Sequence, residues 1–245
     1  MLLAIFDFET DGLDVEKDHP VEVGVILYTT TFKRVVMAES FLVDNEIPIS
    51  KELTEIHKVT TGMATKFGLV PGDGLSRLQN YFDMADTIVG KNIVDFDLPM
   101  YRSWCKRENV EPISKPVIDI ETDLPGVESK KLSYMAADAG FLNPFPHASL
   151  PDAWTSLRLI ELQPDFNKVV ERVKSPRVYV KAHVDFDSNY LAKERKYRWD
   201  PTTKTWFKII KEMDLQQEGA DCTFDISVIE PLVRHESWKK QEVNR

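Results

Sequence analysis

Apolar residues recur with two different periods along the first two thirds of the chain. Alternating or continuous apolar runs predict strands, and apolar spacings of three to four residues predict helices. The predicted strands cover residues 1–8, 20–30, 33–43, 87–90 and 117–120. The predicted helices cover residues 50–57, 75–84, 96–106, 129–139 and 151–162. Strands that come first, then strands that alternate with helices, indicate an α/β fold with a mixed five-stranded sheet flanked by helices.

A second, smaller unit follows this pattern. Lys174-Ser175-Pro176 has the composition of a linker. Beyond it the pattern predicts a strand, a helix, a hairpin and a last strand, at residues 177–185, 187–195, 197–210 and 223–229. We therefore expect two domains, residues 1–173 and 174–245, of which the second is a small α+β domain.

The composition is that of a globular protein in a reducing compartment. Hydrophobic residues make up 42% and charged residues 29% of the chain, which is ordinary for a folded domain. Two distant cysteines, Cys105 and Cys222, exclude a disulfide framework and a cysteine-built zinc site. No apolar run approaches the ~18 residues of a membrane span, and Asp7 interrupts the N-terminal run too early for a signal peptide. We expect a cytoplasmic protein without a membrane partner.

Charge is distributed unevenly between the two predicted domains. The chain carries a formal net charge of -9, which argues against a protein that merely coats nucleic acid. Residues 174–245 carry +2, so residues 1–173 carry -11. An acidic first domain and a slightly basic second domain suggest two different roles.

Two acidic residues share one side of the first predicted strand. Side chains alternate along a strand, so Asp7 and Glu9 point the same way, with their Cβ atoms roughly 6–7 Å apart. Phe6 and Phe8 then point into the core. Two carboxylates aimed together repel each other, and a divalent cation between them is the usual remedy. The plainer alternative is an acidic pair that faces solvent.

Further candidate residues lie at two predicted helix starts. Pro99 is tolerated only near a helix start, so Asp97 falls in a first turn, where the helix dipole favours an ionised carboxylate. Asp152 opens another helix, and His147 lies five residues before it. The ordinary pKa of histidine suits it to remove a proton from water near pH 7. The alternatives are a helix cap, at Asp95 or Asp97, and a surface histidine.

Three segments, taken together, resemble the motifs of one enzyme family. They are Phe6-Asp7-Phe8-Glu9-Thr10-Asp11-Gly12-Leu13, then Asn92…Phe96-Asp97-Leu98, then His147…Asp152-Ala153. In this order and spacing they are similar to the three exonuclease motifs of the DEDDh family. That family holds the proofreading epsilon subunit of bacterial replicases, RNase T and related 3′→5′ exonucleases. The resemblance covers roughly residues 1–165 and implies a ribonuclease H-like fold.

The resemblance also implies a two-metal hydrolysis of phosphodiester bonds that releases nucleoside 5′-monophosphates. Two magnesium or manganese ions would be held by the four acidic residues Asp7, Glu9, Asp97 and Asp152, with His147 as the general base. The terminal nucleotide would contact Thr10, Leu13, His57, Asn92 and Phe96. Three positions depart from the family pattern, namely Lys58, where glycine is common, Lys91, where histidine is frequent, and Pro151 before Asp152. None of the departures removes a predicted metal ligand or the predicted base.

The second predicted domain contains a basic segment with interleaved aromatic residues. Residues 190–211 hold seven Lys or Arg against two acids. On a hairpin, aromatic rings stack on bases while cations meet phosphates. The candidates for accessory nucleic-acid binding are Arg195, Lys196, Arg198, Trp199, Trp206 and Lys208. The alternative is that the two tryptophans form the core of a very small domain. The segment also resembles a small uncharacterised module that is appended to DNA-processing proteins.

The sequence therefore favours a metal-dependent 3′→5′ exonuclease that acts on single-stranded or frayed DNA ends. A polymerase or another replication or repair protein is a candidate partner. Two alternatives stay open: an exoribonuclease or trimmer of short oligonucleotides, and a non-catalytic nucleic-acid-binding protein on a nuclease fold. A pure binder has no need of four converging acids, so the intact set of motifs argues against the last of these.

Overall fold

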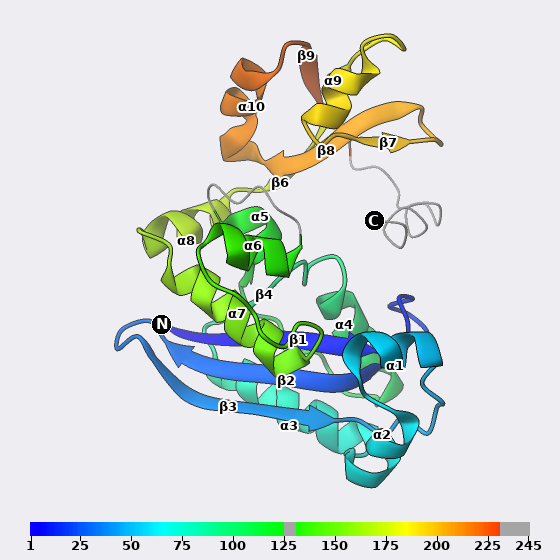
Figure 1. Ribbon diagram of the computed structural model, residues 1–245. Helices are drawn as coiled ribbons and strands as arrows, with labels where there is room; N and C mark the ends of the chain where they lie inside the picture. The colour runs from blue at the N-terminus through cyan, green and yellow to red at the C-terminus, as the bar shows by residue number, and fades with distance from the viewer. Residues whose placement is uncertain (125–130, 231–245) are drawn as a thin grey trace. The chain divides into compact units, whose positions relative to one another are not determined.

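The computed structural model describes residues 1–124 and 131–230 (Figure 1). The chain divides into two compact units, Met1–Val170 and Glu171–Arg245. Each unit has a sheet and a hydrophobic core of its own. None of the helices in the described part of the chain has both the length and the apolar character that crossing a bilayer requires.

The first unit is built on a mixed five-stranded sheet with the order β3-β2-β1-β4-β5. Its strands are β1 (Leu2–Thr10), β2 (Pro20–Thr29), β3 (Arg34–Leu42), β4 (Thr87–Gly90) and β5 (Val117–Asp119). Strand β2 is antiparallel to β1 and β3, whereas β4 is parallel to β1 and β5. The α/β fold predicted from the hydrophobic pattern is confirmed.

Helices flank this sheet on both faces (Figure 1). Those within the described residues of the first unit are α1 (Lys51–His57), α2 (Thr61–Phe67), α3 (Pro71–Met84), α4 (Asp97–Arg107), α5 (Ile120–Asp123), α6 (Leu132–Asp138) and α7 (Ser149–Glu161). A further helix, α8 (Phe166–Lys174), runs across the boundary between the two units. The sequence pattern missed α2, because Ala64 is the single buried residue of its seven. The start of the predicted helix at residues 129–139 lies outside the described residues.

One face of β1 packs into the main core, between α3 and α4. Phe6 is fully buried and Phe8 nearly so, and both belong to a cluster with Trp104 of α4. The rings of Phe8 and Trp104 meet edge to face with centroids 6.3 Å apart, a geometry that adds to the gain from burial. As the alternation along β1 predicts, Asp7 and Glu9 are left on the opposite face.

Helix α7 crosses that opposite face, over β1 and β2 (Figure 1). The backbones of α7 and β2 come close together at Gly24 of β2, where an added Cβ would lie 2.3 Å from the backbone carbonyl carbon of Ser149. Glu22, on the same side of β2, accepts a hydrogen bond from the Ser149 backbone N–H at 3.1 Å. These two contacts fix the first turn of α7 on the sheet.

The second unit has a four-stranded antiparallel sheet with the order β7-β8-β6-β9. Its elements are β6 (Arg177–His183), α9 (Asn189–Glu194), β7 (Arg198–Asp200), β8 (Thr205–Lys211), the 3₁₀ turn η1 (Glu212–Asp214), α10 (Leu215–Asp221) and β9 (Asp225–Ile229). Its buried core cluster is small and contains Val180, Ala182, Ala192 and Tyr197. Phe207 of β8 is buried as well. The predicted hairpin is the β7–β8 pair, whereas α10 was not predicted.

The contact at Gly24 predicts that Gly24→Ala destabilises the first unit. Backbone atoms of α7 would have to move, and forced overpacking of this kind costs about 1–3 kcal/mol or more. Urea unfolding measures the loss. Gly62→Ala in α2 is the matched control, because its nearest neighbour would be the Thr60 hydroxyl at 4.0 Å and alanine favours helix. Equal loss of stability in the two variants would contradict the proposed close fit.

Candidate active site

Acidic side chains from distant parts of the chain meet beside the end of β1. Asp97, the first residue of α4, accepts a hydrogen bond from the Phe8 backbone N–H at 3.2 Å. Phe8 lies between Asp7 and Glu9, so this bond brings Asp97 to the strand that carries both of them. The acids of the first and second motifs are therefore neighbours, as the sequence motifs predict.

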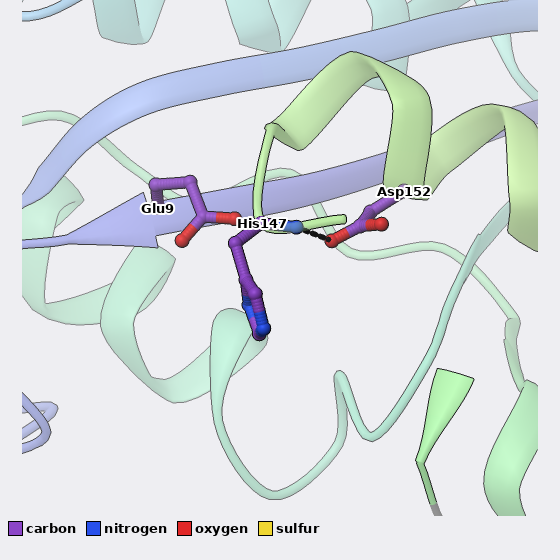
Figure 2. A group of neighbouring side chains, drawn as sticks. All are labelled: Glu9, His147 and Asp152. Carbon is purple, nitrogen blue, oxygen red and sulfur yellow. Dashed lines mark hydrogen bonds between the residues drawn. The ribbon is translucent and has the colours of Figure 1, made fainter. Parts of the chain in front are cut away.

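The third motif reaches the same place from α7. Ligand atoms of Glu9, His147 and Asp152 lie within 4.8 Å of one another (Figure 2). Asp7 lies close enough to Asp152 and to Asp97 for both charges to act on its carboxyl. All five predicted catalytic residues thus gather at one end of β1, with His147 the most exposed of the group that Figure 2 draws.

The loop before α7 wraps around the Asp152 carboxylate. The backbone N–H of His147 donates to one carboxylate oxygen at 3.1 Å, and the Asn143 side-chain amide donates to the other. His147 adopts a left-handed backbone conformation with φ 63°, which non-glycine residues rarely take. Pro151 falls in the first turn of α7, where a missing N–H is tolerated. The loop thus links the predicted base to a predicted ligand through the backbone.

The loop before α4 is organised by Asp119, a residue that the sequence reading missed. Its carboxylate, 1% exposed at the end of β5, accepts from the backbone N–H groups of Asn92, Val94 and Glu121 at 2.9, 3.1 and 3.0 Å. Asn92 has φ 58°. The bonds from Asn92 and Val94 fold the β4–α4 loop around one buried carboxyl group and so set where α4 begins at Asp97. An acid that ends an otherwise apolar strand was the available signal.

Lys91 supplies positive charge near the acids. Its ammonium group pairs with the Glu121 carboxylate at 3.1 Å. Its charge opposes the rise of the carboxyl pKa values of Asp7 and Asp97. Lys91 is therefore a partly buried cation that is fixed by an acid.

Burial and mutual repulsion raise the carboxyl pKa values of the cluster. Burial raises the pKa of Asp7 well above its usual range, and the charges of Asp97, Asp152 and Glu9 add to the effect. Burial, then the charges of Asp152 and Glu22, raise the pKa of Glu9 to about 8. Burial raises the pKa of Asp97 to about 7. Burial and repulsion disfavour the ionised form of these carboxyl groups. A divalent cation suits such hard oxygen donors, because its positive charge stabilises the ionised form.

His57 lies at the buried edge of this group. Its Nδ1 accepts from the Val59 backbone N–H at 3.1 Å, its Nε2 is buried, and the ring also interacts with the Thr10 backbone. Burial lowers the pKa of His57, so the ring is neutral near pH 7 and carries its proton on Nε2. Lys58 takes the left-handed position, φ 64°, that ends α1, a backbone conformation that favours glycine.

The other predicted nucleotide contacts differ in their surroundings. Thr10 is buried, and its hydroxyl donates to the Gly12 carbonyl oxygen at 2.7 Å. Leu13 is 51% exposed. Phe96 is half-buried and packs against the main core. Leu13 is therefore the apolar side chain among them that solvent reaches most readily.

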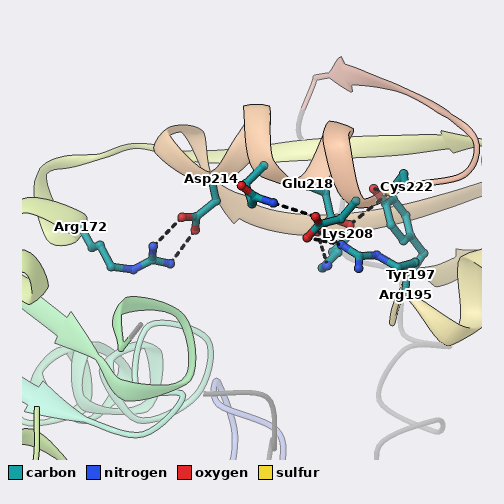
Figure 3. Close-up of polar contacts among 9 residues, drawn as sticks. Arg172, Arg195, Tyr197, Lys208, Asp214, Glu218 and Cys222 are labelled. Carbon is teal, nitrogen blue, oxygen red and sulfur yellow. Dashed lines mark hydrogen bonds and ion pairs between the residues drawn. The ribbon is translucent and has the colours of Figure 1, made fainter. Parts of the chain in front are cut away.

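The accessory candidates of the second unit fall into three groups. Arg195 and Lys208 donate to the Glu218 carboxylate at 3.0 and 2.8 Å (Figure 3). Burial alone would raise the pKa of Glu218, but the bond to Lys208 and the charge of Arg195 hold it below its usual value. Trp199 and Trp206 lie side by side with ring centroids 5.5 Å apart. Lys196 and Arg198 lie on the surface.

Glu22 is a second residue that the sequence reading missed. It lies directly opposite Glu9 in the β1–β2 register and holds Ser149, the first residue of α7. Its charge raises the pKa of both Glu9 and Asp152. An acid at a strand position flanked by buried apolar residues was the signal.

Comparison with known proteins points to one family. A family model described as exonuclease matches residues 4–160. The PolC-type DNA polymerase III of Mycoplasma genitalium is 31% identical over 116 residues, which are 47% of this chain and 8% of that protein. Its counterpart from Mycoplasma pneumoniae is 30% identical over 142 residues, 56% of this chain and 10% of that protein. The chain spans a tenth or less of the length of these curated relatives.

Solved structures of E. coli exonuclease I share the fold. The complex with a 5cy-dT13 oligonucleotide superposes with a TM-score of 0.61 at 16% identity, over 84% of this chain and 50% of that one. The complex with a dA16 oligonucleotide gives 0.64 at 14% identity, over 91% and 68%. The fold is thus the ribonuclease H-like mixed sheet that the motifs implied.

The raised pKa of Glu9 predicts that the ion-free protein loses stability as pH rises. The pKa is 4.5 in the unfolded chain and about 8 in the folded one. Between these values the folded state binds more protons, so the free energy of unfolding falls with rising pH. Thermal unfolding in EDTA at pH 5.5, 7.0 and 8.5 measures the trend.

Glu9→Gln is the control, because an amide does not ionise. The Tm of the variant is expected to rise relative to wild type as pH increases. Manganese is expected to raise the wild-type Tm most at pH 8.5 and to help the variant less. A difference in Tm between the two proteins that stays constant with pH would refute the predicted protonation of Glu9.

Proposed function

Because the chain belongs to the exonuclease family whose model matches residues 4–160, we propose that it is a metal-dependent 3′→5′ exonuclease. Its substrate is the 3′ end of single-stranded or frayed DNA. The observation that carries the proposal is the convergence of Glu9, His147 and Asp152 on the sheet face that holds Asp7. Hydrolysis resides in the domain of residues 1–173.

The choice of DNA rests on the proteins that this chain resembles. The sequence relatives are DNA polymerases, and solved structures with the same fold hold dT13 and dA16 oligonucleotides. Both comparisons favour a deoxyribonucleotide strand over RNA. A polymerase or another replication or repair protein is the partner that the same relatives suggest.

Asp7, Glu9, Asp97 and Asp152 would hold two Mg²⁺ or Mn²⁺ ions. The carboxylates carry -4 when ionised, so two divalent cations would make the site nearly neutral and able to accept a phosphodiester. Such ions, when bound, lower the pKa of a water and stabilise charge on the leaving oxygen. The raised carboxyl pKa values support this assignment, because cations would remove the repulsion that causes part of the rise.

Protein side chains supply the proton transfer and hold the nucleotide. The exposed imidazole of His147 removes a proton from the attacking water, and its backbone bond to Asp152 keeps it beside the acids. His57, whose ring interacts with the Thr10 backbone, helps to position the terminal nucleotide. Leu13, exposed at the end of the first motif, packs against the sugar or base.

Release of mononucleotides from labelled 30-residue DNA strands tests the proposal. With Mg²⁺ or Mn²⁺, a 3′ label is expected to leave first as a mononucleotide, and a 5′-labelled strand is expected to shorten stepwise. Asp7→Asn removes a charge at the centre of the cluster and should abolish detectable turnover. His147→Gln should lower kcat by about 10²–10⁴-fold, the usual worth of a general base.

Asp138→Asn is the matched control, since Asp138 is an exposed acid on α6 outside the site. It should retain wild-type turnover. Mononucleotide release that persists in EDTA would contradict the metal requirement. Early release of a 5′ label would contradict the polarity, and faster turnover of a matched ribo-oligomer would contradict the assignment to DNA.

A further inference from the structure

Part of the positive charge of the basic segment, residues 190–211, is balanced by ion pairs within the second unit. Arg195 and Lys208 both bind Glu218, which is 8% exposed (Figure 3). Lys211 is 6% exposed. These three cations are therefore held within the unit and are poor candidates for meeting a phosphate backbone. A nucleic-acid site in this unit has to be built from other side chains.

An aromatic strip runs from α9 to the β7–β8 hairpin. Trp199 and Trp206 pair across the hairpin, so both indoles lie on one face of the sheet. The Lys193 ammonium lies 5.7 Å from the centroid of the Trp206 ring. Tyr190 is three residues before Lys193 on α9, on the same side of that helix. Lys193 therefore links this side of α9 to the tryptophan pair.

The two ends of the strip are open to solvent. Trp206 is half-buried and packs against the small core, so it supports the exposed rings of the strip from below. Trp199 is 37% exposed and Tyr190 is 55% exposed. A unit with so little apolar material would gain stability by burying these exposed rings against a ligand.

The charges beside the strip select its ligand. Lys193 and Lys204, at the hairpin turn, are exposed cations. Of the neighbouring acids, Glu194 is exposed on α9, whereas Asp200 is 1% exposed and its carboxylate accepts from the Thr202 backbone N–H at 3.0 Å, so Asp200 adds little repulsion at the surface. An anionic ligand with flat apolar groups fits such a surface, and single-stranded nucleic acid has this chemistry.

We propose that Tyr190, Lys193 and Trp199, supported by Trp206, form a stacking site for single-stranded nucleic acid on the second unit. Bases stack on the tyrosine and indole rings while the ammonium of Lys193 meets the backbone phosphates. Phe186 is excluded from the site although it is 88% exposed, because Asp185 and Asp187 flank it and would repel a phosphate. The choice of ligand rests on the proposed function of the first unit, whose substrate is a strand.

Fluorescence anisotropy of labelled oligo(dT), titrated with the full chain in EDTA, tests the site. EDTA stops the proposed hydrolysis, so binding is measured whether or not the chain is a nuclease. Trp199→Ala is expected to weaken binding roughly five- to hundredfold, the range for loss of one stacked base. Trp199→Phe keeps a ring and should retain most of the affinity.

Phe186→Ala is the matched control, as it removes an exposed ring outside the strip, and it should bind like wild type. Lys193→Gln should reduce the slope of log K against log salt by about 0.7, the value for one phosphate contact on a single strand. Wild-type affinity in Trp199→Ala would overturn the proposal even where mononucleotide release succeeds. Equal losses in Trp199→Ala and Phe186→Ala would also overturn it. Selective loss in Trp199→Ala without any nuclease activity would uphold this site and defeat the proposed function alone.

Discussion

Repulsion among carboxylates at the end of β1 is the constraint that the rest of the first unit has to overcome. Asp7, Glu9, Asp97 and Asp152 are brought together where burial already disfavours their charge, and their pKa values rise accordingly. A chain free to relax would let these side chains separate. The fold therefore has to provide rigid attachments for each acid, and the proposed divalent cations would balance the charge of the ionised acids.

The attachments are made mainly by backbone atoms, which do not change rotamer. The Phe8 N–H binds Asp97, and the His147 N–H binds Asp152. Asp119 gathers the amides of the β4–α4 loop, and Gly24 lets α7 approach β2 until backbone nearly meets backbone. Such supports keep the acids close together without adding a competing side chain to the space that a ligand would occupy.

The second unit is under a different constraint: its core is too small to bury all its aromatic rings. Its strongest ion pairs lie inside the unit: Arg172 binds Asp214 through two bonds of 2.5 Å, and Glu218 binds Arg195 and Lys208 (Figure 3). Charge thus stabilises this unit where apolar packing is scarce. Trp199 stays partly exposed, and with Trp206 it forms an aromatic surface beside Lys193.

The sequence by itself predicted the five strands of the first unit, the alternation of β1 and the residues that are candidates for the chemistry, but it missed α2 and α10. The predicted features follow from local periodicity and from the order of the motifs, both of which can be read from the sequence alone. The tertiary structure alone decided that Glu22 and Asp119 are supports and that Arg195 and Lys208 serve Glu218. Charge pairing and close backbone approach depend on which distant segments become neighbours. Ser149 and Glu22 are 127 residues apart, and no local pattern encodes a contact over that separation.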